Sequence, residues 1–337
     1  MIGVLRFSLL LGLVCVVSAR AEIYELPPEG HDVIGAVSTI TARYEDTLVD
    51  IARRHGLGYE EIVRANPDVN IWVPGEGTEV VLPTQFVLPA GPRRGVVLNL
   101  AEYRMYYFPE PEDGKPAYVM TYPISIGRMD WETPLGVTKV ISKVRNPTWY
   151  PPQSVRDEHA ADGRSLGRIV PPGPNNPLGK FAMRLGLPGY LIHGTNRPSG
   201  VGMRVTHGCV RMFPEDIEYL FAHVDVNTPV RIINDPVKMG WSGERLVVEV
   251  HPVLEVAAPV ENAATDNEAP VSDGSPAKDY VLKDPLTHVT EKFIAATDAR
   301  AGVIDWQLVE RIVQRADGVP AVVGERIKNA ATSAAFQ

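Results

Sequence analysis

HGTNRPSGVGMRVTHGCVRM, residues 193–212, carries two histidines and one cysteine among glycines, a proline and a serine. Tyr190 to Ile192 lead into it as a short apolar run, and Val201 to Val205 lead toward the cysteine. Short apolar runs bounded by Gly and Pro are typical of strand, turn and strand. Such a pair would bring His193 back beside Cys209. A nucleophilic thiol needs a neighbour of this kind, as a base or to depress its pKa.

The composition limits what the rest of the chain can be. The 337 residues carry a formal net charge of −8, and this length predicts two or three compact units. The acidic balance argues against nonspecific nucleic-acid binding, so no nucleic-acid partner is expected. With 29 glycines and 30 prolines, strands, turns and linkers are favoured over long helices.

Residues 1–21 have the pattern of a cleavable export signal. Arg6 supplies the positive charge, Phe7 to Val17 the apolar core, and Ala19 to Ala21 the small-residue cleavage site. The apolar run is too short to span a bilayer comfortably. We therefore expect an exported mature protein that starts near Glu22.

Export would leave Cys209 as the one remaining cysteine, because Cys15 lies within the signal. A lone cysteine in an exported protein is a free thiol or an intermolecular link. The plain alternative is an inert buried thiol. The histidines at 193 and 207, and Gly208 beside the cysteine, favour a reactive one.

Residues 38–83 predict a small strand–helix–helix–strand unit. Thr39 to Arg43 alternates as a half-buried strand does, and Asp46 or Thr47 caps a helix that ends near Gly56. Tyr59 to Ala65 forms the second helix and Glu79 to Leu82 the closing strand.

Residues 95–235 are strand-rich and predict a mainly β, sandwich-like domain. Residues 96–100 and 103–107 fit a hairpin, and Pro214 to His223 fits one helix with a single apolar face. Asn146 to Pro174 holds too many prolines, glycines and charges for regular structure. A long loop of this kind is usually a lid or a binding loop.

The C-terminal third contains no candidate site residues. Residues 236–256 would extend the β domain, and residues 257–286, rich in Ala, Pro, Glu, Asp and Ser, predict a linker. Residues 287–337 resume helical spacing and predict a short helical tail.

Residues 38–83 resemble the LysM module, which binds glycan chains containing N-acetylglucosamine. The matching pieces are Asp46 to Leu48, Ile51-Ala52, Ile62 to Pro67 and Pro74 to Pro83. The resemblance implies a glycan-binding module, and the alternative is an N-terminal brace without a ligand.

His193-Gly194 followed by Thr206 to Met212 resembles the active-site signature of the L,D-transpeptidases, the YkuD-like catalytic domain. Thr133 to Gly136 and Asn146 to Pro152 resemble further pieces of that family. Many members carry Ser where Thr206 stands, so the hydroxyl is kept but its supporting contact is in doubt. The resemblance covers residues 95–235.

The resemblance implies periplasmic acyl transfer on peptidoglycan, without a cofactor. Cys209 would attack the carbonyl that joins the diamino acid of a tetrapeptide stem to its terminal D-Ala, leaving a thioester. A second stem's amine would then give a 3-3 cross-link, a lysine of an outer-membrane lipoprotein would give an anchored protein, and water would give hydrolysis. These three acceptors stay open.

The candidate catalytic residues are Cys209 as nucleophile, His193 as base and then acid, and His207 as a neighbour that shapes the site or tunes the thiolate. The carbonyl of Gly194 would orient His193. The remaining candidates bind or support the substrate: Thr206 through its hydroxyl, Gly208 by leaving room and sharing an oxyanion hole with Cys209, and Arg211 by holding a stem carboxylate.

Two other classes of protein fit the same residues. His193, His207 and Cys209 are acceptable zinc ligands, as in a zinc-dependent wall hydrolase, but no fourth ligand accompanies them and no metal is expected. In a noncatalytic peptidoglycan-binding protein, the LysM-like unit would bind glycan and the thiol would be incidental.

Overall fold

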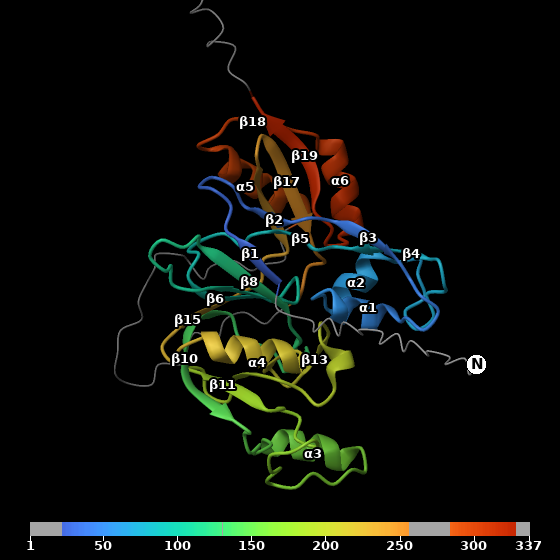
Figure 1. Ribbon diagram of the computed structural model, residues 1–337, viewed down its shortest axis with the longest axis vertical. Coiled ribbons are helices and arrows are strands. Elements are labelled where there is room, and N and C mark those ends of the chain that lie inside the picture. Colours follow the sequence, from blue (N-terminus) through green and yellow to red (C-terminus); the bar gives the residue numbers. More distant parts are fainter. Residues whose placement is uncertain (1–21, 130, 256–283, 328–337) are drawn as a thin grey trace, which may run out of the picture.

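The computed structural model describes residues 22–129, 131–255 and 284–327. Figure 1 shows a strand-rich centre with a separate C-terminal unit above it, a small helical module to its right, and a segment carrying α3 below it. The predicted signal (1–21) and most of the predicted linker (257–283) lie outside the described residues. No described helix is long and apolar enough to cross a membrane.

The central sheet has nine strands in the order β1-β8-β7-β6-β15-β10-β11-β12-β14. Neighbours run antiparallel, except that β6 pairs parallel with β15 and β12 parallel with β14. Two further short strands, β9 and β13, pair with each other. The bounds are Glu22–Glu25 (β1), Gly95–Asn99 (β6), Arg104–Phe108 (β7), Tyr118–Pro123 (β8), Ile126–Gly127 (β9), Gly136–Arg145 (β10), Phe181–Leu185 (β11), Leu191–His193 (β12), Arg204–Thr206 (β13), Val210–Arg211 (β14) and Pro229–Ile233 (β15).

Both faces of β6 and β7 are buried, each against a different partner. Leu98 and Met105 face a core that includes helix α4 (Pro214–His223). Val97 and Tyr106 face the core of the N-terminal module. Because side chains alternate along a strand, the apolar run at residues 96–98 contributes to two cores at once. The mainly β fold and helix α4 are confirmed.

The N-terminal module has the predicted strand–helix–helix–strand order. Strand β3 pairs antiparallel with β4, and the hydroxyl of Thr47 caps α1 by accepting from the Asp50 N–H at 3.0 Å. A second strand pair, β2 with β5, joins the module to the rest. The bounds are Val33–Gly35 (β2), Ser38–Thr41 (β3), Leu48–Arg54 (α1), Tyr59–Ala65 (α2), Glu79–Leu82 (β4) and Gln85–Val87 (β5).

The C-terminal third differs from the expectation. Residues 237–250 do not extend the central sheet: they form a hairpin whose second strand pairs with β19, and the predicted helical tail contains two strands. Leu246 and Val248 leave an apolar face on the hairpin, and Val289 and Ile312 of the tail helices cover it. The bounds are Val237–Ser242 (β16), Arg245–Val250 (β17), Pro285–Thr297 (α5), Gly302–Ile304 (β18), Trp306–Arg315 (α6) and Ala321–Arg326 (β19).

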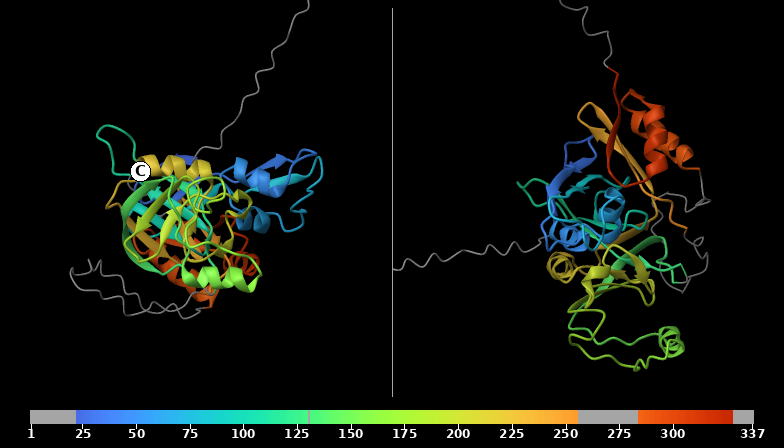
Figure 2. Two further views of the ribbon diagram at one scale, coloured as in Figure 1. Left: turned by 90° about the horizontal axis from the view of Figure 1, so that it is seen from below. Right: turned by 90° about the vertical axis from the view of Figure 1, so that its right-hand side faces the viewer.

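A second difference lies in the long loop, which contains helix α3 (Gln153–Ala161). Its residues are adequate helix formers, and Pro152 before it and Gly163 after it set its ends. The expectation of no regular structure over residues 146–174 was therefore wrong. Figure 2 shows this segment projecting from the end of the domain opposite the C-terminal unit.

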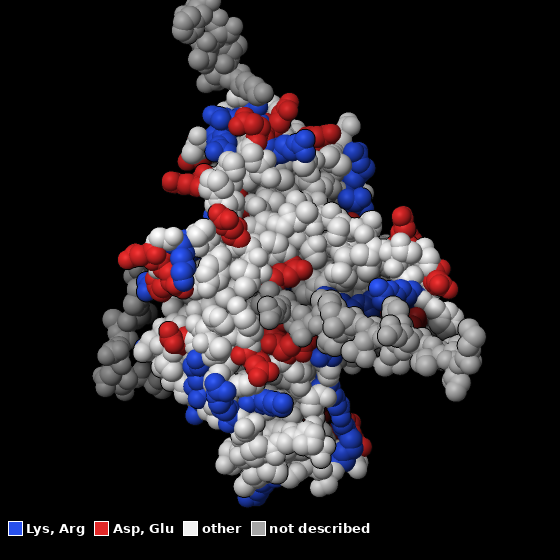
Figure 3. All heavy atoms as spheres, in the orientation of Figure 1, with Lys and Arg blue, Asp and Glu red and all other residues white. Residues whose placement is uncertain are grey.

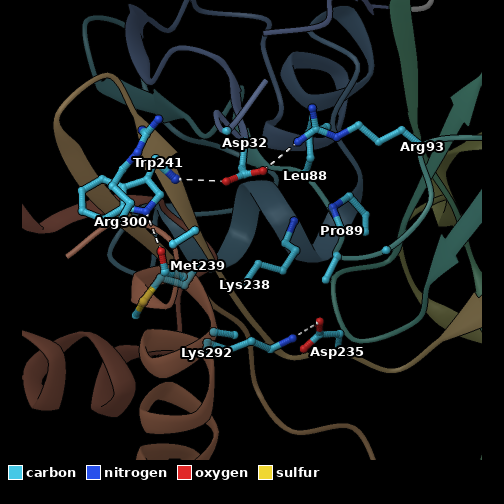
Figure 4. A pocket seen from close by; sticks show the side chains of 16 residues that line it. Asp32, Leu88, Pro89, Arg93, Asp235, Lys238, Met239, Trp241, Lys292 and Arg300 are labelled. Atoms are coloured by element: carbon cyan, nitrogen blue, oxygen red, sulfur yellow. Dashed lines mark hydrogen bonds and ion pairs between the residues drawn. The ribbon is translucent and has the colours of Figure 1, made fainter. Parts of the chain in front are cut away.

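Charged side chains hold the units together. The Lys238 ammonium lies 2.5 Å from Glu102 of the central domain and 2.9 Å from Glu249, and all three are buried. Around a nearby pocket of about 430 Å³, Asp32 pairs with Arg93 and Asp235 with Lys292 (Figure 4). These pairs tie the N-terminal leader and helix α5 to the central domain.

The buried pair between Arg104 of β7 and Glu61 of α2 joins the module to the sheet at 2.6 and 2.9 Å. Arg104→Ala should lower the free energy of unfolding by about 3–5 kcal/mol, because it leaves a buried carboxylate without its cation. Chemical denaturation measures this. Arg94→Ala, which breaks an exposed pair with Glu110, is the control and should change little. An equal decrease in the free energy of unfolding for both variants would contradict a stabilising role for the buried pair.

Candidate active site

The parallel pairing of β12 with β14 assembles the site. Ile192 lies opposite Val210 and His193 opposite Arg211. Ile192 and Val210 point into the core, so the alternating side chains of Leu191, His193, Cys209 and Arg211 face one cavity. His193 and Cys209 are thus brought together, but by a crossover and not by the simple strand–turn–strand pair expected. The crossover contains the short 3-10 helix η1 (Pro198–Gly200) and β13.

His193 is buried with one ring nitrogen committed. Its Nδ1 lies 2.6 Å from the carbonyl oxygen of Gly194, which can only accept, so Nδ1 carries the proton and Nε2 is the basic atom. Burial, together with the charge of Arg211, lowers the pKa of His193 to about 4. The imidazole is therefore neutral at neutral pH. Gly194 stands where it was expected, as the residue that orients the ring.

Cys209 is also neutral. Burial raises the pKa of its thiol above the ordinary value, while the Leu191 N–H and the charge of Arg211 oppose the shift. The Sγ donates to the carbonyl oxygen of Gly189 at 3.6 Å. Of the two roles expected for a neighbour of this thiol, a base or a group that depresses its pKa, these pKa directions favour the base, because burial keeps both His193 and Cys209 uncharged.

His207 makes its polar contacts with the long loop. Its Nε2 donates to Glu158 of α3 at 2.7 Å, and its ring meets Trp131 edge-on at 5.2 Å between centroids. Arg128 donates twice to the same carboxylate, at 2.8 and 2.9 Å. Hydrogen bonds from Arg128 and His207 lower the pKa of Glu158 to about 2. The side chain of His207 lines the cavity but ties the loop down, which favours the shaping role over tuning of the thiolate.

Glu158 is the residue that sequence reasoning missed. It is an acidic residue within a charged loop, and no spacing connects it to His207, 49 positions away. We name residues 146–177 the lid, because Pro147, Trp149, Val155 and Pro177 line one wall of the cavity.

Gly208 has a different role from the one expected. Its φ is +94°, and a Cβ there would lie 2.8 Å from the Tyr190 ring and 3.3 Å from the Glu132 carbonyl oxygen. The space beside it is filled by protein and not left for substrate, so the glycine is required by the turn itself. The turn also interrupts the extended backbone between His207 and Cys209.

Two threonine hydroxyls brace the nucleophile turn. Thr206 Oγ1 donates to the carbonyl oxygen of Cys209 at 2.6 Å, and Thr133 Oγ1 donates to that of Gly208 at 2.8 Å. Thr133 belongs to the upstream turn, Thr133 to Gly136, that resembles the family. Its hydrogen bond shows that this turn supports the backbone at Gly208. Thr206 therefore supports the turn, and its added methyl leaves the hydroxyl contact in place.

The cavity is about 860 Å³ and cationic, although the chain as a whole is acidic. Acidic and basic side chains are interspersed on the face shown in Figure 3. Among the described residues, Glu158 is the one acidic side chain that lines the cavity. Its basic lining consists of three histidines and five arginines: Arg128, Arg164, Arg184, Arg197 and Arg211.

The buried Nε of Arg211 has no hydrogen-bond partner among the described residues. Arg128 shares that feature, but its other two guanidinium nitrogens are held by Glu158. Burial, together with the charge of Arg197, lowers the pKa of Arg211. A buried guanidinium that repels a second one is a ready site for a carboxylate.

The ligand atoms of His193, His207 and Cys209 do not form a group within 4.8 Å of one another, which disfavours the zinc alternative. Within the described residues, the group that does is Glu102, Glu249 and His251. There the Lys238 ammonium already lies against both carboxylates, so the cluster supplies its own cation.

Comparison with known proteins agrees with this geometry. Residues 93–232 match the YkuD family, described as the L,D-transpeptidase catalytic domain. The probable L,D-transpeptidase ErfK/SrfK of Salmonella typhimurium is 38% identical over 302 residues, covering 88% of this chain and 89% of that protein. The chain therefore belongs to the L,D-transpeptidase family.

A second curated relative shows the same relationship. The probable L,D-transpeptidase YcfS of Escherichia coli is 41% identical over 70% of this chain and 74% of its own length. The solved catalytic domain of the E. faecium L,D-transpeptidase is 23% identical, with a TM-score of 0.31 over 42% of this chain and 96% of that domain. The predicted enzyme class, an L,D-transpeptidase and hence an acyltransferase, is confirmed.

The two pKa shifts predict how the thiol responds to pH. Alkylation of Cys209 by iodoacetamide should keep accelerating above the pKa of a free thiol, about 8.5, because burial disfavours the thiolate. The acid limb of kcat/KM should lie near pH 4, where activity is lost as His193 gains a proton. Rates from pH 3 to 10, read by mass spectrometry, check both. A plateau of fast alkylation between pH 5 and 7 would indicate a resting thiolate–imidazolium pair instead.

Proposed function

We propose that this L,D-transpeptidase works in the periplasm and forms a thioester between Cys209 and a peptidoglycan tetrapeptide stem. The observation that carries the proposal is the cavity face shared by β12, Cys209 and β14. It holds the thiol of Cys209, the imidazole of His193 with its Nδ1 bound to Gly194, and the guanidinium of Arg211, whose buried Nε has no hydrogen-bond partner among the described residues. A stem that ends in the D-Ala carboxylate offers the anion that such a cationic cavity lacks. The predicted export signal supports the periplasmic location.

The first half-reaction follows from the protonation states. The sulfur of Cys209 attacks the carbonyl carbon between the diamino acid and D-Ala, and its proton passes to Nε2 of His193. The Gly194 carbonyl holds the ring through Nδ1 and stabilises the charge that forms. Backbone N–H groups at Gly208 and Cys209 would receive the oxyanion. The imidazolium then protonates the departing amine, the C–N bond breaks, and D-Ala leaves.

The second half-reaction reverses the roles. His193 takes a proton from the acceptor as the acceptor attacks the thioester, and the released sulfur regains a proton. A second stem's amine yields a 3-3 cross-link, a lysine of an outer-membrane lipoprotein yields a wall-anchored protein, and water yields a shortened stem. Muropeptide analysis of a deletion strain separates these products.

We further propose that the N-terminal module is a LysM-type glycan-binding unit. Tyr44, in the loop before α1, and Trp72, in the loop after α2, are 82% and 62% exposed. Large apolar side chains exposed together on one unit favour a ligand-binding surface. A noncatalytic glycan-binding protein would share this module but would have no need for the paired His193 and Cys209.

Cys209→Ala should abolish formation of cross-linked or anchored muropeptides, because the proposed acyl intermediate is a thioester and Cys209 is the one cysteine among the described residues. A carbapenem should add one inhibitor mass to the parent protein and none to the variant. Intact-mass spectrometry and muropeptide chromatography check these results. Full activity in the folded variant would eliminate the thioester mechanism.

Arg211→Gln should raise KM for a tetrapeptide donor about tenfold or more, because a hydrogen bond to a charged group contributes roughly 1.5–3 kcal/mol. Steady-state kinetics on a soluble donor measure the change. Arg164→Gln is the matched control: Arg164 also lines the cavity, but its guanidinium already pairs with Asp162 at 2.5 Å. Equal KM increases in the two variants would reject a specific carboxylate site at Arg211.

A further inference from the structure

The N-terminal module contacts the nucleophile segment, Met203 to Met212, on its upstream side. The first N–H groups of α2 donate to carbonyl oxygens of the crossover: Tyr59 to Val201 at 3.0 Å and Glu60 to Gly202 at 3.2 Å. Amides that open a helix have no partner within it, so the crossover satisfies them. The backbone of the module is thus bonded directly to the loop that leads to Cys209.

Two glycines make this contact possible. A Cβ on Gly58 would lie 2.7 Å from the Cα of Gly202, and a Cβ on Gly202 would lie 2.5 Å from the Cα of Gly58. Real Cβ atoms do not approach backbone atoms so closely. The two backbones therefore meet at a separation that a side chain on either would prevent.

The module also contacts the segment that follows Arg211. Arg53 of α1 donates twice to Glu215 in the first turn of α4, at 2.7 and 2.9 Å. Its guanidinium also lies over the ring of Phe213, 5.4 Å from the centroid. Figure 1 shows α1 and α2 beside β13 and α4, the elements on either side of the nucleophile. The segment that carries Cys209 is therefore held at both ends by one unit.

The module is itself fixed to the sheet. Glu61 accepts from the Gly58 N–H at 2.6 Å and from Arg104 of β7 at 2.6 and 2.9 Å. The side chain of Arg104 is fully buried, and that of Glu61 is 8% exposed. Because the start of α2 cannot shift without breaking this pair, it can serve as a fixed point for the crossover.

The upstream contact reaches the active site through Ser125. The Ser125 hydroxyl donates to the Gly200 carbonyl oxygen at 2.7 Å. Its backbone exchanges hydrogen bonds with Arg211, at 2.8 and 3.0 Å. The crossover and the strand of Arg211 thus share one buried anchor, so a displacement of residues 200–202 is transmitted to Arg211 and Cys209.

We propose that the N-terminal module is a positioning element of the active site, and that Gly58 and Arg53 are its positioning residues. They set the place of Cys209 and Arg211 relative to His193, whose own strand is held by β11. The proposal rests on the proposed thioester chemistry for its natural substrate. It is separate from glycan binding, which we assign to Tyr44 and Trp72.

Gly58→Ala tests the proposal by inserting one methyl group between the two backbones. Its native φ of −92° accepts alanine, so the steric wedge is the main perturbation. The second-order rate of Cys209 acylation by a carbapenem should fall about tenfold or more, since small misplacements of reacting groups have effects of this size. Binding of insoluble peptidoglycan should stay at the parent level.

Gly77→Ala is the matched control within the module. Gly77 has a φ of +85° and nothing within 4 Å of an added Cβ, so alanine strains the module without touching the crossover. Its acylation rate should stay within about twofold of the parent. Equal losses in the two variants would mean that general destabilisation of the module, and not its fit to Gly202, lowers the rate.

A charge exchange tests the downstream contact without a steric wedge. Arg53→Glu should lower the acylation rate, and adding Glu215→Arg should restore it, because the ion pair is then rebuilt in reverse. Acylation that is unchanged in both Gly58→Ala and Arg53→Glu would overturn the proposal and leave the module as a tether. If the parent protein acylates normally but forms no cross-linked or anchored muropeptides, the proposed function fails while the positioning role stands.

Discussion

The active site depends on the parallel register between β12 and β14. Ile192 and Val210 are buried in the core and fix that register. A slip of β14 by one residue would turn Cys209 and Arg211 into the core and Val210 toward the cavity, so that the thiol would no longer share a face with His193. Parallel neighbours need a crossover, so residues 194–209 must leave the sheet and return. That path creates the loop which the N-terminal module holds and the glycine turn which presents the sulfur.

Burial and the charge of Arg211 together set the protonation states of His193 and Cys209. Burial keeps both His193 and Cys209 neutral, and Arg211 lowers the pKa of each. A substrate carboxylate bound to Arg211 would cancel part of its field, and the pKa of His193 would then rise toward its ordinary value. The pKa of the Cys209 thiol would rise as well, so that a stronger base would face a weaker acid and the two effects would oppose each other. A resting neutral thiol is also a poorer target for oxidation than a thiolate.

Sequence patterns predicted the elements whose signal is local. Helix α4 was predicted from Pro214 to His223 because Ile217, Leu220 and Phe221 recur at helical spacing on one side. The first hairpin and the module's strand–helix–helix–strand order were predicted from alternation and capping. The signature around Cys209 indicated the family, and the orienting carbonyl of Gly194 lies where it was expected because it is adjacent in sequence to His193.

Contacts between distant residues could not be predicted in this way. Strand β17 precedes the polar residues 257–286 and β19 follows them, yet the two strands pair. Nothing in the sequence of either strand indicates which strand it pairs with. The bond between Glu158 and His207 depends on how the lid folds back. The neutrality of Cys209 depends on burial, which a motif does not report. Gly208 looked like space for substrate because a sequence does not show which side chain, here that of Tyr190, fills the gap.

The exposure of the ion pairs distinguishes a strong contact, between the N-terminal module and the sheet, from a weak one, between the lid and the rest of the domain. Arg104 and Glu61 are 0% and 8% exposed, so breaking their pair leaves a buried charge and is strongly disfavoured. Glu158 and Arg128 are 33% and 36% exposed, and pairs this open to water contribute only about 0–1 kcal/mol. Because the pKa of Glu158 is lowered to about 2, its contribution is full above the ordinary carboxyl pKa and is lost as the pH falls toward 2. The lid contact is therefore charged at every working pH yet easily exchanged for water. The lid is thus held over the cavity by a weak exposed contact, whereas the module that contacts the segment of Cys209 is held by a strong buried one.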